Sequence, residues 1–457
     1  MTGSSEGISQ LYLTGKGNRS YFDVRSVYYY GFSGADTQSQ IPVIHPVLDY
    51  MYTFDHPVLG GELGYKVNFT SLTRQSADFE AITQNALTNN TCMQTADPAV
   101  KTSASCVLRG VPGTYSRFSA QTSWRRSITD PIGEVFTPFA YLRADAASLQ
   151  IDNEPGVSNF LNSGDNNLVR AMPTVGLEYR YPFISAESWG TQTIEPIAQV
   201  IARPDEPQIG KWPNEDAQSF VFDDSNLFRV DKFSGWDRVE GGGRANYGLQ
   251  YTAQFNGGGF VNALFGESYS LFGKNSFAQT DLTNTGLNSG LDTTRSDYVA
   301  RFSFQPNRTY TFTSRFRFDK DTFATQRTEL EASGNFGRWN ASVLYGDYAP
   351  QPLLGFLDRR QGILGTAQVK LDANWILLGG ARYDLNADKF DQTRIGLGYI
   401  DDCLILALNY ITNYSYGTGV PVLDHTIMLQ LSLRTLGGTS VSQNVSAVTG
   451  ANGVGGL

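Results

Sequence analysis

Residues 308–319 read RTYTFTSRFRFD, a stretch in which two kinds of side chain alternate. One set of alternate positions is aromatic: Tyr310, Phe312, Phe316 and Phe318. The positions between them carry hydroxyl or cationic groups: Thr309, Thr311, Thr313, Arg315 and Arg317. A period of two predicts a β-strand with one apolar and one polar face. Such a strand fits a soluble sandwich, or a membrane barrel with the aromatics toward lipid and the arginines toward a wet lumen.

The same alternation recurs along the whole chain and indicates about 18 strands of about 9–14 residues, a length that suits tilted spans of a bilayer. The segments are 20–32, 46–54, 59–72, 114–124, 133–146, 170–183, 191–203, 238–255, 258–272, 295–304, 308–319, 324–335, 338–348, 361–371, 374–385, 391–400, 403–413 and 424–434. Short turns alternate with long polar loops, among them 72–113 and 204–237. Tight turns on one side and long loops on the other are typical of membrane barrels, so we predict an all-β, antiparallel transmembrane β-barrel.

Composition agrees with this prediction. The 457 residues carry a net charge of −9, which argues against a dedicated nucleic-acid binder. No run of 18 apolar residues exists, and the mean hydropathy of −0.27 excludes a helical membrane protein. A barrel is compatible with these values because only alternate residues need to face lipid. The first ten residues, MTGSSEGISQ, contain no signal peptide, so we expect an outer-membrane chain of this kind to be a mature form or a fragment.

The chain contains three cysteines. Cys92 and Cys106 bracket a polar stretch inside the predicted loop 72–113, where they form either a local disulfide or two loop thiols. In an oxidising compartment we expect the disulfide, which would contribute about 3 kcal/mol by closing the loop. Cys403 is the odd cysteine, either a buried strand thiol or half of a bridge to something outside this chain.

Residues that could support catalysis are scarce. The three histidines, His45, His56 and His425, accompany neither a nucleophile motif nor a metal-binding cluster. Four acidic residues superficially resemble a cation site but lack the spacing of a calcium loop: Glu215, Asp216, Asp223 and Asp224. We therefore predict no catalytic residue, no metal site and no cofactor.

Residues 214–248 read NEDAQSFVFDDSNLFRVDKFSGWDRVEGGGRANYG, which is too polar for a spanning strand and too aromatic for a floppy loop. This stretch resembles the barrel domain of the LPS-assembly protein family, LptD, of Gram-negative outer membranes. Four further stretches extend the resemblance in the same order: LYLTGKGNRSYFDVRSVYYYGF, PVLDYMYTFDHPVLGGELGYKVNFTSLTR, GYIDDCLILALNY and LQLSLRTLGG. The resemblance covers nearly the whole chain.

The resemblance implies a function without covalent chemistry: lipopolysaccharide (LPS) is inserted into the outer leaflet through a lateral seam between the first and last barrel strands. It also implies an LptE-like lipoprotein plug and an LptA-like periplasmic bridge that docks on a β-jellyroll domain. Membrane lipids are the other expected partners, and nucleic acid is not. Cys403 matches the position of a family cysteine that is bonded to the periplasmic domain.

The chain departs from the complete family pattern in length. We expect residues 1–457 to be the C-terminal part of the barrel, without the jellyroll and the first barrel strands. The strand 424–434 would then have either an unpaired edge, which is an association hazard, or an improvised partner. The alternative function is an outer-membrane diffusion porin, in which lumen-facing residues such as Arg315 and Arg317 filter solutes.

Overall fold

The computed structural model describes residues 6–31, 36–89, 92, 105–161, 164, 166–416, 421–433 and 437–444. Its first strands are β1 (Glu6–Lys16), β2 (Ser20–Gly31), β3 (Val43–Thr53), β4 (Glu62–Arg74), β5 (Asp78–Ala81), β6 (Cys106–Gly110), β7 (Gly113–Arg125), β8 (Ile128–Thr129), β9 (Val135–Ile151), β10 (Asn167–Arg180), β11 (Phe183–Glu187) and β12 (Gly190–Ala202). Its later strands are β13 (Gly243–Phe255), β14 (Phe260–Phe272), β15 (Tyr298–Gln305), β16 (Tyr310–Phe318), β17 (Thr325–Asn335), β18 (Trp339–Tyr348), β19 (Arg360–Lys370), β20 (Trp375–Asp384), β21 (Lys389–Ile400), β22 (Leu404–Tyr416), β23 (Pro421–Leu433) and β24 (Gly437–Asn444). The short helix α1 spans Gln84–Asn89, and no helix in the described ranges is long and apolar enough to cross a membrane.

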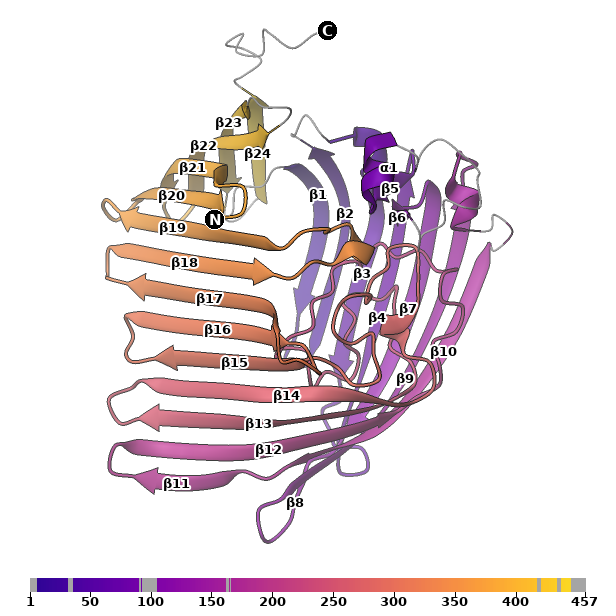
Figure 1. Cartoon of the computed structure of the whole chain (residues 1–457), viewed down its shortest axis with the longest axis vertical. Coiled ribbons are helices and arrows are strands. Elements are labelled where there is room, and N and C mark those ends of the chain that lie inside the picture. Colours follow the sequence, from indigo (N-terminus) through magenta and orange to yellow (C-terminus); the bar gives the residue numbers. More distant parts are fainter. Residues whose placement is uncertain are drawn as a thin grey trace.

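One antiparallel sheet of 22 strands contains all of these strands except β5 and β6, which pair with each other. Each long strand pairs with the next one along the chain, as in a meander. Figure 1 shows the sheet curving from the steep strands β1–β10 round to β12–β19, with irregular segments inside the bend. The predicted all-β, antiparallel fold class is confirmed. Among the strands that the structure describes, no backbone ladder joins β1 to β24.

Two predictions about the ends of the sheet are wrong. The first strand is β1, which pairs with β2 along its whole length, and not the segment 20–32. The predicted last strand, 424–434, corresponds to β23, and β23 pairs with both β22 and β24. Its edge is therefore covered, and Arg434 lies outside the described residues. The count of about 18 strands was too low because β1 and β24 lack a clear apolar alternation, and β8 and β11 are too short to show one.

The two faces of the sheet differ as the period of two predicts. On β16 the rings of Tyr310 and Phe312 are 41% and 43% exposed on the convex, outer face, whereas Arg317 is 6% exposed on the concave, inner face. The same alternation on β10 exposes Val169 and buries Leu168. Apolar side chains on the outside of a strand and polar ones inside are the pattern of a barrel wall in lipid.

A row of directly opposed polar residues crosses the inner face from β1 to β10. The row consists of Thr14, Asp23, Asp49, Asn68, Ser119, Asp145 and Arg170. Arginines pair with two of its three acids: Arg25 donates to Asp23 at 2.7 Å, and Arg170 donates to Asp145 at 2.6 Å. The register of six adjacent strand pairs therefore produces a polar inner surface.

Aromatic pairs on the outer face mark two levels of the wall. At the end where short turns join the strands (the turn end), Tyr310 packs against Phe336 at 5.6 Å and Trp375 against Tyr399 at 5.2 Å. At the opposite end, where the long loops emerge (the loop end), Phe318 packs against Phe323 at 4.8 Å. Aromatic bands at both interfaces are expected for strands that span a bilayer.

The predicted loop 72–113 is more ordered than expected. β4 continues to Arg74, and the loop that follows contains β5, α1 and β6. Apolar residues of this loop form a small core with residues from two other loops: Ala77, Leu108, Val111, Val157, Leu161 and Leu282. These few residues are dispersed among polar ones, so the sequence shows no periodic signal for them.

Candidate functional site

The segment 203–242 connects β12 to β13 and lies against the inner face of the sheet without forming a strand or helix. We call it the inward segment. Its side chains Phe222, Leu227 and Phe233 are buried in one cluster with residues of β14, β15 and the loop 273–297. Ring contacts at 4.5 Å join Phe233 to Phe277 of that loop. The aromatic residues noted in the sequence therefore anchor this segment to the wall.

Some acidic residues of the inward segment bind arginines of the early wall strands β4 and β7. Both carboxylate oxygens of Glu215 accept hydrogen bonds from Arg74, at the end of β4, at 2.7 Å. Asp216 pairs with Arg117 of β7 at 3.0 Å. Asp237, which is 0% exposed, also pairs with Arg117. One arginine of β7 thus connects two parts of the inward segment that are 21 residues apart.

Asp237 organises the backbone of the inward segment as well. Its carboxylate accepts the backbone N–H groups of Glu215 at 2.6 Å and Asp216 at 3.0 Å, and the hydroxyl of Tyr115 at 2.6 Å. In return Asp216 accepts the backbone N–H of Asp237 at 2.9 Å. Burial raises the pKa of Asp237 to about 6, although the charge of Arg117 opposes the rise.

Two consecutive acids of the inward segment, Asp223 and Asp224, bind arginines of the later wall strands β15, β16 and β17. Asp224 pairs with Arg301 of β15 at 2.8 Å and with Arg315 of β16 at 3.4 Å. Arg301 and Arg315 lie directly opposite each other in the ladder, where two like charges would repel. The Asp224 side chain is 1% exposed and sits between them, so it offsets this repulsion. Asp223 pairs with Arg327 of β17 at 3.3 Å.

A third group of charges joins the two ends of the inward segment to the loop 273–297. Arg238 is buried and pairs with Glu206 at 3.1 Å and with Asp281 of the loop 273–297. The guanidinium of Arg238 also lies 4.5 Å from the ring centre of Phe233. These contacts hold the inward segment to the loop 273–297.

Lys232 and Glu240 form a buried polar pocket with wall residues. The Lys232 amine donates to Asn246 Oδ1 of β13 at 3.2 Å, and burial lowers its pKa to about 7. Burial also raises the pKa of Glu240, but the charges of Arg203, Lys232 and Arg244 outweigh this effect and lower it to about 2. Glu240 therefore remains ionised while Lys232 is poised to lose its proton near neutral pH.

The two arginines singled out in the sequence both lie on the inner face. Arg315 contacts Asp224 as described above, and Arg317 pairs with Asp297 at 3.2 Å. Arg317 also donates to the backbone oxygen of Ser289. Both side chains are engaged by inward loops, which the pattern of one strand could not reveal.

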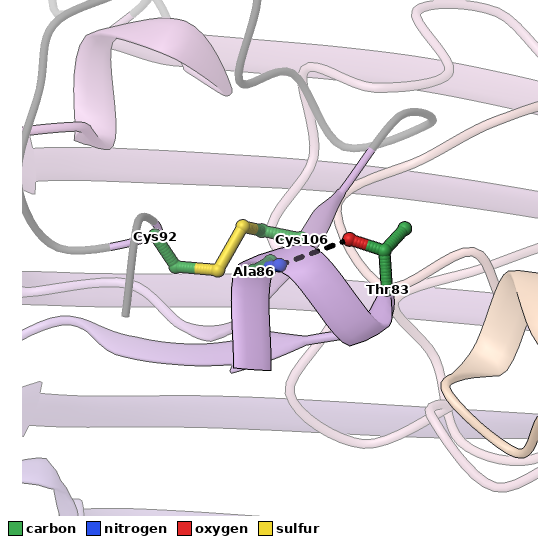
Figure 2. Close-up of a disulfide and its surroundings, with 4 residues drawn as sticks. All are labelled: Thr83, Ala86, Cys92 and Cys106. Atoms are coloured by element: carbon green, nitrogen blue, oxygen red, sulfur yellow. Dashed lines mark hydrogen bonds between the residues drawn. A yellow bond between two sulfur atoms is a disulfide. The ribbon is translucent and has the colours of Figure 1, made fainter. Parts of the chain in front are cut away.

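Cys92 and Cys106 are joined by a disulfide in the loop between β4 and β7 (Figure 2). Beside the bond, the backbone N–H of Ala86 donates to Thr83 Oγ1 at 3.3 Å and caps the start of α1. The stretch 93–104 between the cysteines lies outside the described residues. Cys403 is exposed in the short turn 401–403, at the turn end of the wall.

Sequence reasoning missed the role of the four acids Glu215, Asp216, Asp223 and Asp224. Each pairs with an arginine on a wall strand. Within the residues that the structure describes, no group of three or more His, Cys, Asp or Glu side chains is arranged to hold a metal ion. The available signal was the excess of acids in 214–248 together with arginines at alternate positions of the strands.

A curved antiparallel sheet with aromatic bands outside and ion-paired loops inside defines the wall of an outer-membrane β-barrel. The family model described as "LptD: LPS transport system D" matches residues 2–354. The chain belongs to this family, which places it in the Gram-negative outer membrane. It is 23% identical over 337 residues to the LPS-assembly protein LptD of Acinetobacter baumannii, a match that covers 71% of this chain and 38% of that protein.

Two solved structures are also similar to this chain. The FrpB iron transporter of Neisseria meningitidis (F5-1 variant) is 10% identical with a TM-score of 0.45, covering 96% of this chain and 77% of that one. The ferric enterobactin receptor PfeA of Pseudomonas aeruginosa, as its R480A mutant with enterobactin, is 8% identical with a TM-score of 0.44, covering 94% and 71%.

Proposed function

We propose that this chain forms part of an outer-membrane machine that transports LPS and inserts it into the outer leaflet without covalent chemistry. The match of residues 2–354 to the LptD family carries this proposal. The similarity to an LPS-assembly protein supports it, although the chain spans 38% of that relative's length.

A lateral exit between β1 and β24 is the route that we propose for the lipid. Two observations support it: Cα atoms of the two strands approach within 8 Å, and no backbone ladder joins them in the described residues. Leu11 and Leu13 of β1 are 80% and 64% exposed, so the edge strand presents apolar side chains. An opening with an apolar rim would let acyl chains remain in the bilayer while the saccharide passes.

The orientation follows from the lengths of the connections. Short turns face the periplasm and long loops face outward in barrels of this membrane, so the inward segment would enter from the extracellular side. Cys403 would then face the periplasm, where it could bond to a cysteine of a periplasmic domain. We also propose an LptE-like lipoprotein plug within the lumen and an LptA-like bridge on the periplasmic side.

The test is surface LPS in cells depleted of this protein. Depletion should reduce LPS labelled by an impermeant probe at the cell surface, and re-expression of the full gene should restore it. A photo-crosslinking residue at Leu11 should capture LPS, whereas one at Leu177, on the outer face of β10 toward the turn end and away from the edge, should not. Unchanged surface LPS on depletion would refute the proposal.

A diffusion porin would behave differently in the same cells. Depletion would slow the entry of small hydrophilic solutes and leave surface LPS unchanged. The inward segment fills part of the inner face with buried ion pairs, which favours transport over an open pore.

A further inference from the structure

A groove of about 400 Å³ lies on the outer face of the wall, across β10, β12, β13 and β14. We call it the outer-face groove. Pro196, Ala198 and Leu249 are among its lining residues and give it an apolar surface. Its volume falls within the range of about 300–1,000 Å³ that is typical of ligand sites. Because it lies outside the lumen, its contents come from the bilayer and not from the water inside the barrel.

The outer-face groove exists because one small side chain interrupts a row of rings. Tyr179 of β10, Ala198 of β12 and Tyr247 of β13 are directly opposed in the ladder, at outward-facing positions. The side chain of Ala198 is a single methyl group, so a gap remains between the two tyrosine rings. Pro196 and Leu249, the next opposed outward pair, continue the groove toward the turn end.

The other end of the groove, toward the loops, is aromatic and polar. Glu267 accepts a hydrogen bond from the hydroxyl of Tyr247 and pairs with Arg295 at 3.1 Å. The Glu267 side chain is 8% exposed and the Arg295 side chain is 40% exposed, so the accessible part of this pair is the cation. The rings of Phe265 and Tyr298, 5.3 Å apart, lie beside the pair. This end therefore has the composition of a membrane interface.

Arg295 retains hydrogen-bond donors for a further anion. Its Nε bonds to Glu267, and its Nη2 donates to the Tyr298 hydroxyl at 2.5 Å and to the backbone oxygen of Lys320 at 2.6 Å. These contacts use three of the five N–H donors of a guanidinium and leave those of Nη1. A phosphate oxygen is a strong acceptor for such a charged donor.

We propose that the outer-face groove holds one acyl chain of a phosphate-bearing lipid of the outer leaflet, with the phosphate at Arg295. The chain would run from Arg295 toward the bilayer midplane, past Ala198 and along Pro196 and Leu249. Its methylene groups would gain close contacts between the two tyrosine rings, which a chain on a smooth wall does not make. The inference rests on the proposed function for the outward orientation of the loops.

The position of the groove separates this lipid from the cargo of the proposed exit. The groove lies on β10–β14, whereas the exit that we propose lies between β1 and β24. A lipid in the groove would be a resident of the wall.

The experiment uses the protein purified from outer membranes, with any lipoprotein that purifies with it, in phosphatidylcholine vesicles. One probe is phosphatidic acid with a diazirine in one acyl chain, and the other is diacylglycerol with the same labelled chain. After photolysis, peptide mass spectrometry locates the labelled residues. Labelling of the outer face of β9 gives the background of a wall that contacts lipid without a groove.

Three variants test the parts of the site. A198F places a ring in the gap between the two tyrosines, and A144F adds the same ring at an exposed, outward-facing position of β9 as the matched control. R295Q/E267Q replaces both members of the ion pair with neutral residues, so no orphaned charge is left behind. A heat-modifiable band on electrophoresis confirms that each variant is folded.

We expect phosphatidic acid to label β12 and β13 at the groove about fivefold above the β9 background in the wild type and in A144F. A198F should lose this excess, because the chain no longer fits between the rings. R295Q/E267Q should reduce the labelling by phosphatidic acid to the level of diacylglycerol, because the neutral pair no longer attracts the phosphate.

Wild-type labelling in A198F would overturn the location of the chain. Equal labelling by the two probes in the wild type would overturn the role of the phosphate. Failure of the transport proposal has a separate readout, since surface LPS would then be unchanged on depletion. The probes reach both leaflets of the vesicles, so the labelling result does not depend on which way the loops face.

Discussion

Replacing Arg117 with methionine should loosen the inward segment from β7. The substitution removes the charge and keeps most of the apolar stem, so it removes the ion pairs with Asp216 and Asp237 and the hydrogen bond to Asn68. Removal of one partner from a buried ion pair costs about 3–5 kcal/mol. Asp237 is fully buried, but it keeps the Tyr115 hydroxyl and two backbone N–H donors, so we expect the lower end of that range.

The protonation of Asp237 limits the cost further. Its pKa is already about 6 with Arg117 present, and loss of the nearby positive charge raises it. At pH 7 the carboxyl therefore takes up a proton in the variant. We expect a loss of about 3 kcal/mol in the local stability of the inward segment at pH 7.

Hydrogen exchange measures this loss directly. The backbone N–H groups of Glu215, Asp216, Trp236 and Asp237 all donate to the two carboxylates of the cluster. A loss of about 3 kcal/mol corresponds to an exchange that is about a hundredfold faster at these amides. The double variant R117M/D237N should recover part of the protection because asparagine is neutral without the proton uptake that Asp237 requires at pH 7. Exchange that differs from the wild type by less than threefold at all four amides would refute this account.

Three further predictions concern other parts of the wall. D224N should leave Arg301 and Arg315 to repel each other, because Asp224 pairs with both. Protease should then cleave the inward segment faster, while the barrel stays heat-modifiable. Unchanged cleavage would contradict the electrostatic role of Asp224. The pKa of Lys232 is lowered to about 7 in the folded protein, below its value in the unfolded chain. The free energy of unfolding is therefore higher at high pH and decreases as the pH falls toward 7. Exchange protection near Lys232 should therefore rise from pH 7 to pH 9.5 in the wild type, and K232M should abolish that rise; an equal rise in K232M would show that another group causes it. F312R, on the outer face, should lower the free energy of unfolding by about 2–4 kcal/mol if it lies near the midplane, whereas T313R on the inner face should cost less than 1 kcal/mol in urea unfolding; equal costs would reverse the assignment of the faces.

The period of two was sufficient to predict most wall strands, because each strand needs one face in lipid. The segment 308–319 was expected as a strand, and β16 spans Tyr310–Phe318 within it. β1 was missed because its apolar residues Leu11, Tyr12 and Leu13 are consecutive and break the alternation. β24, with the sequence GGTSVSQN, has one large apolar residue and no period at all. Backbone pairing to β23 determines this strand, and that information lies outside its own sequence.

The site could be predicted less well than the fold. Its contacts join residues far apart in the chain, as with Arg74 and Glu215, which are 141 positions apart. Such a pair depends on the path of the inward segment across the sheet, and no local pattern encodes that path. The acids of 214–248 and the arginines of the strands were both visible in the sequence. Their mutual pairing appears only when the register of several strands is known.

The distribution of ion pairs also distinguishes two parts of the inner face. Acids of the inward segment pair with wall arginines from β4 to β17, so the charges on that part of the inner face are largely matched. A cavity of about 700 Å³ lies farther along the inner face, over β16–β21, and its lining contains three arginines and no acid. An anionic molecule in the lumen would therefore be attracted toward β19–β21 and away from the inward segment. Because the attraction acts across water, added salt should weaken it, whereas the buried pairs under the inward segment should change little.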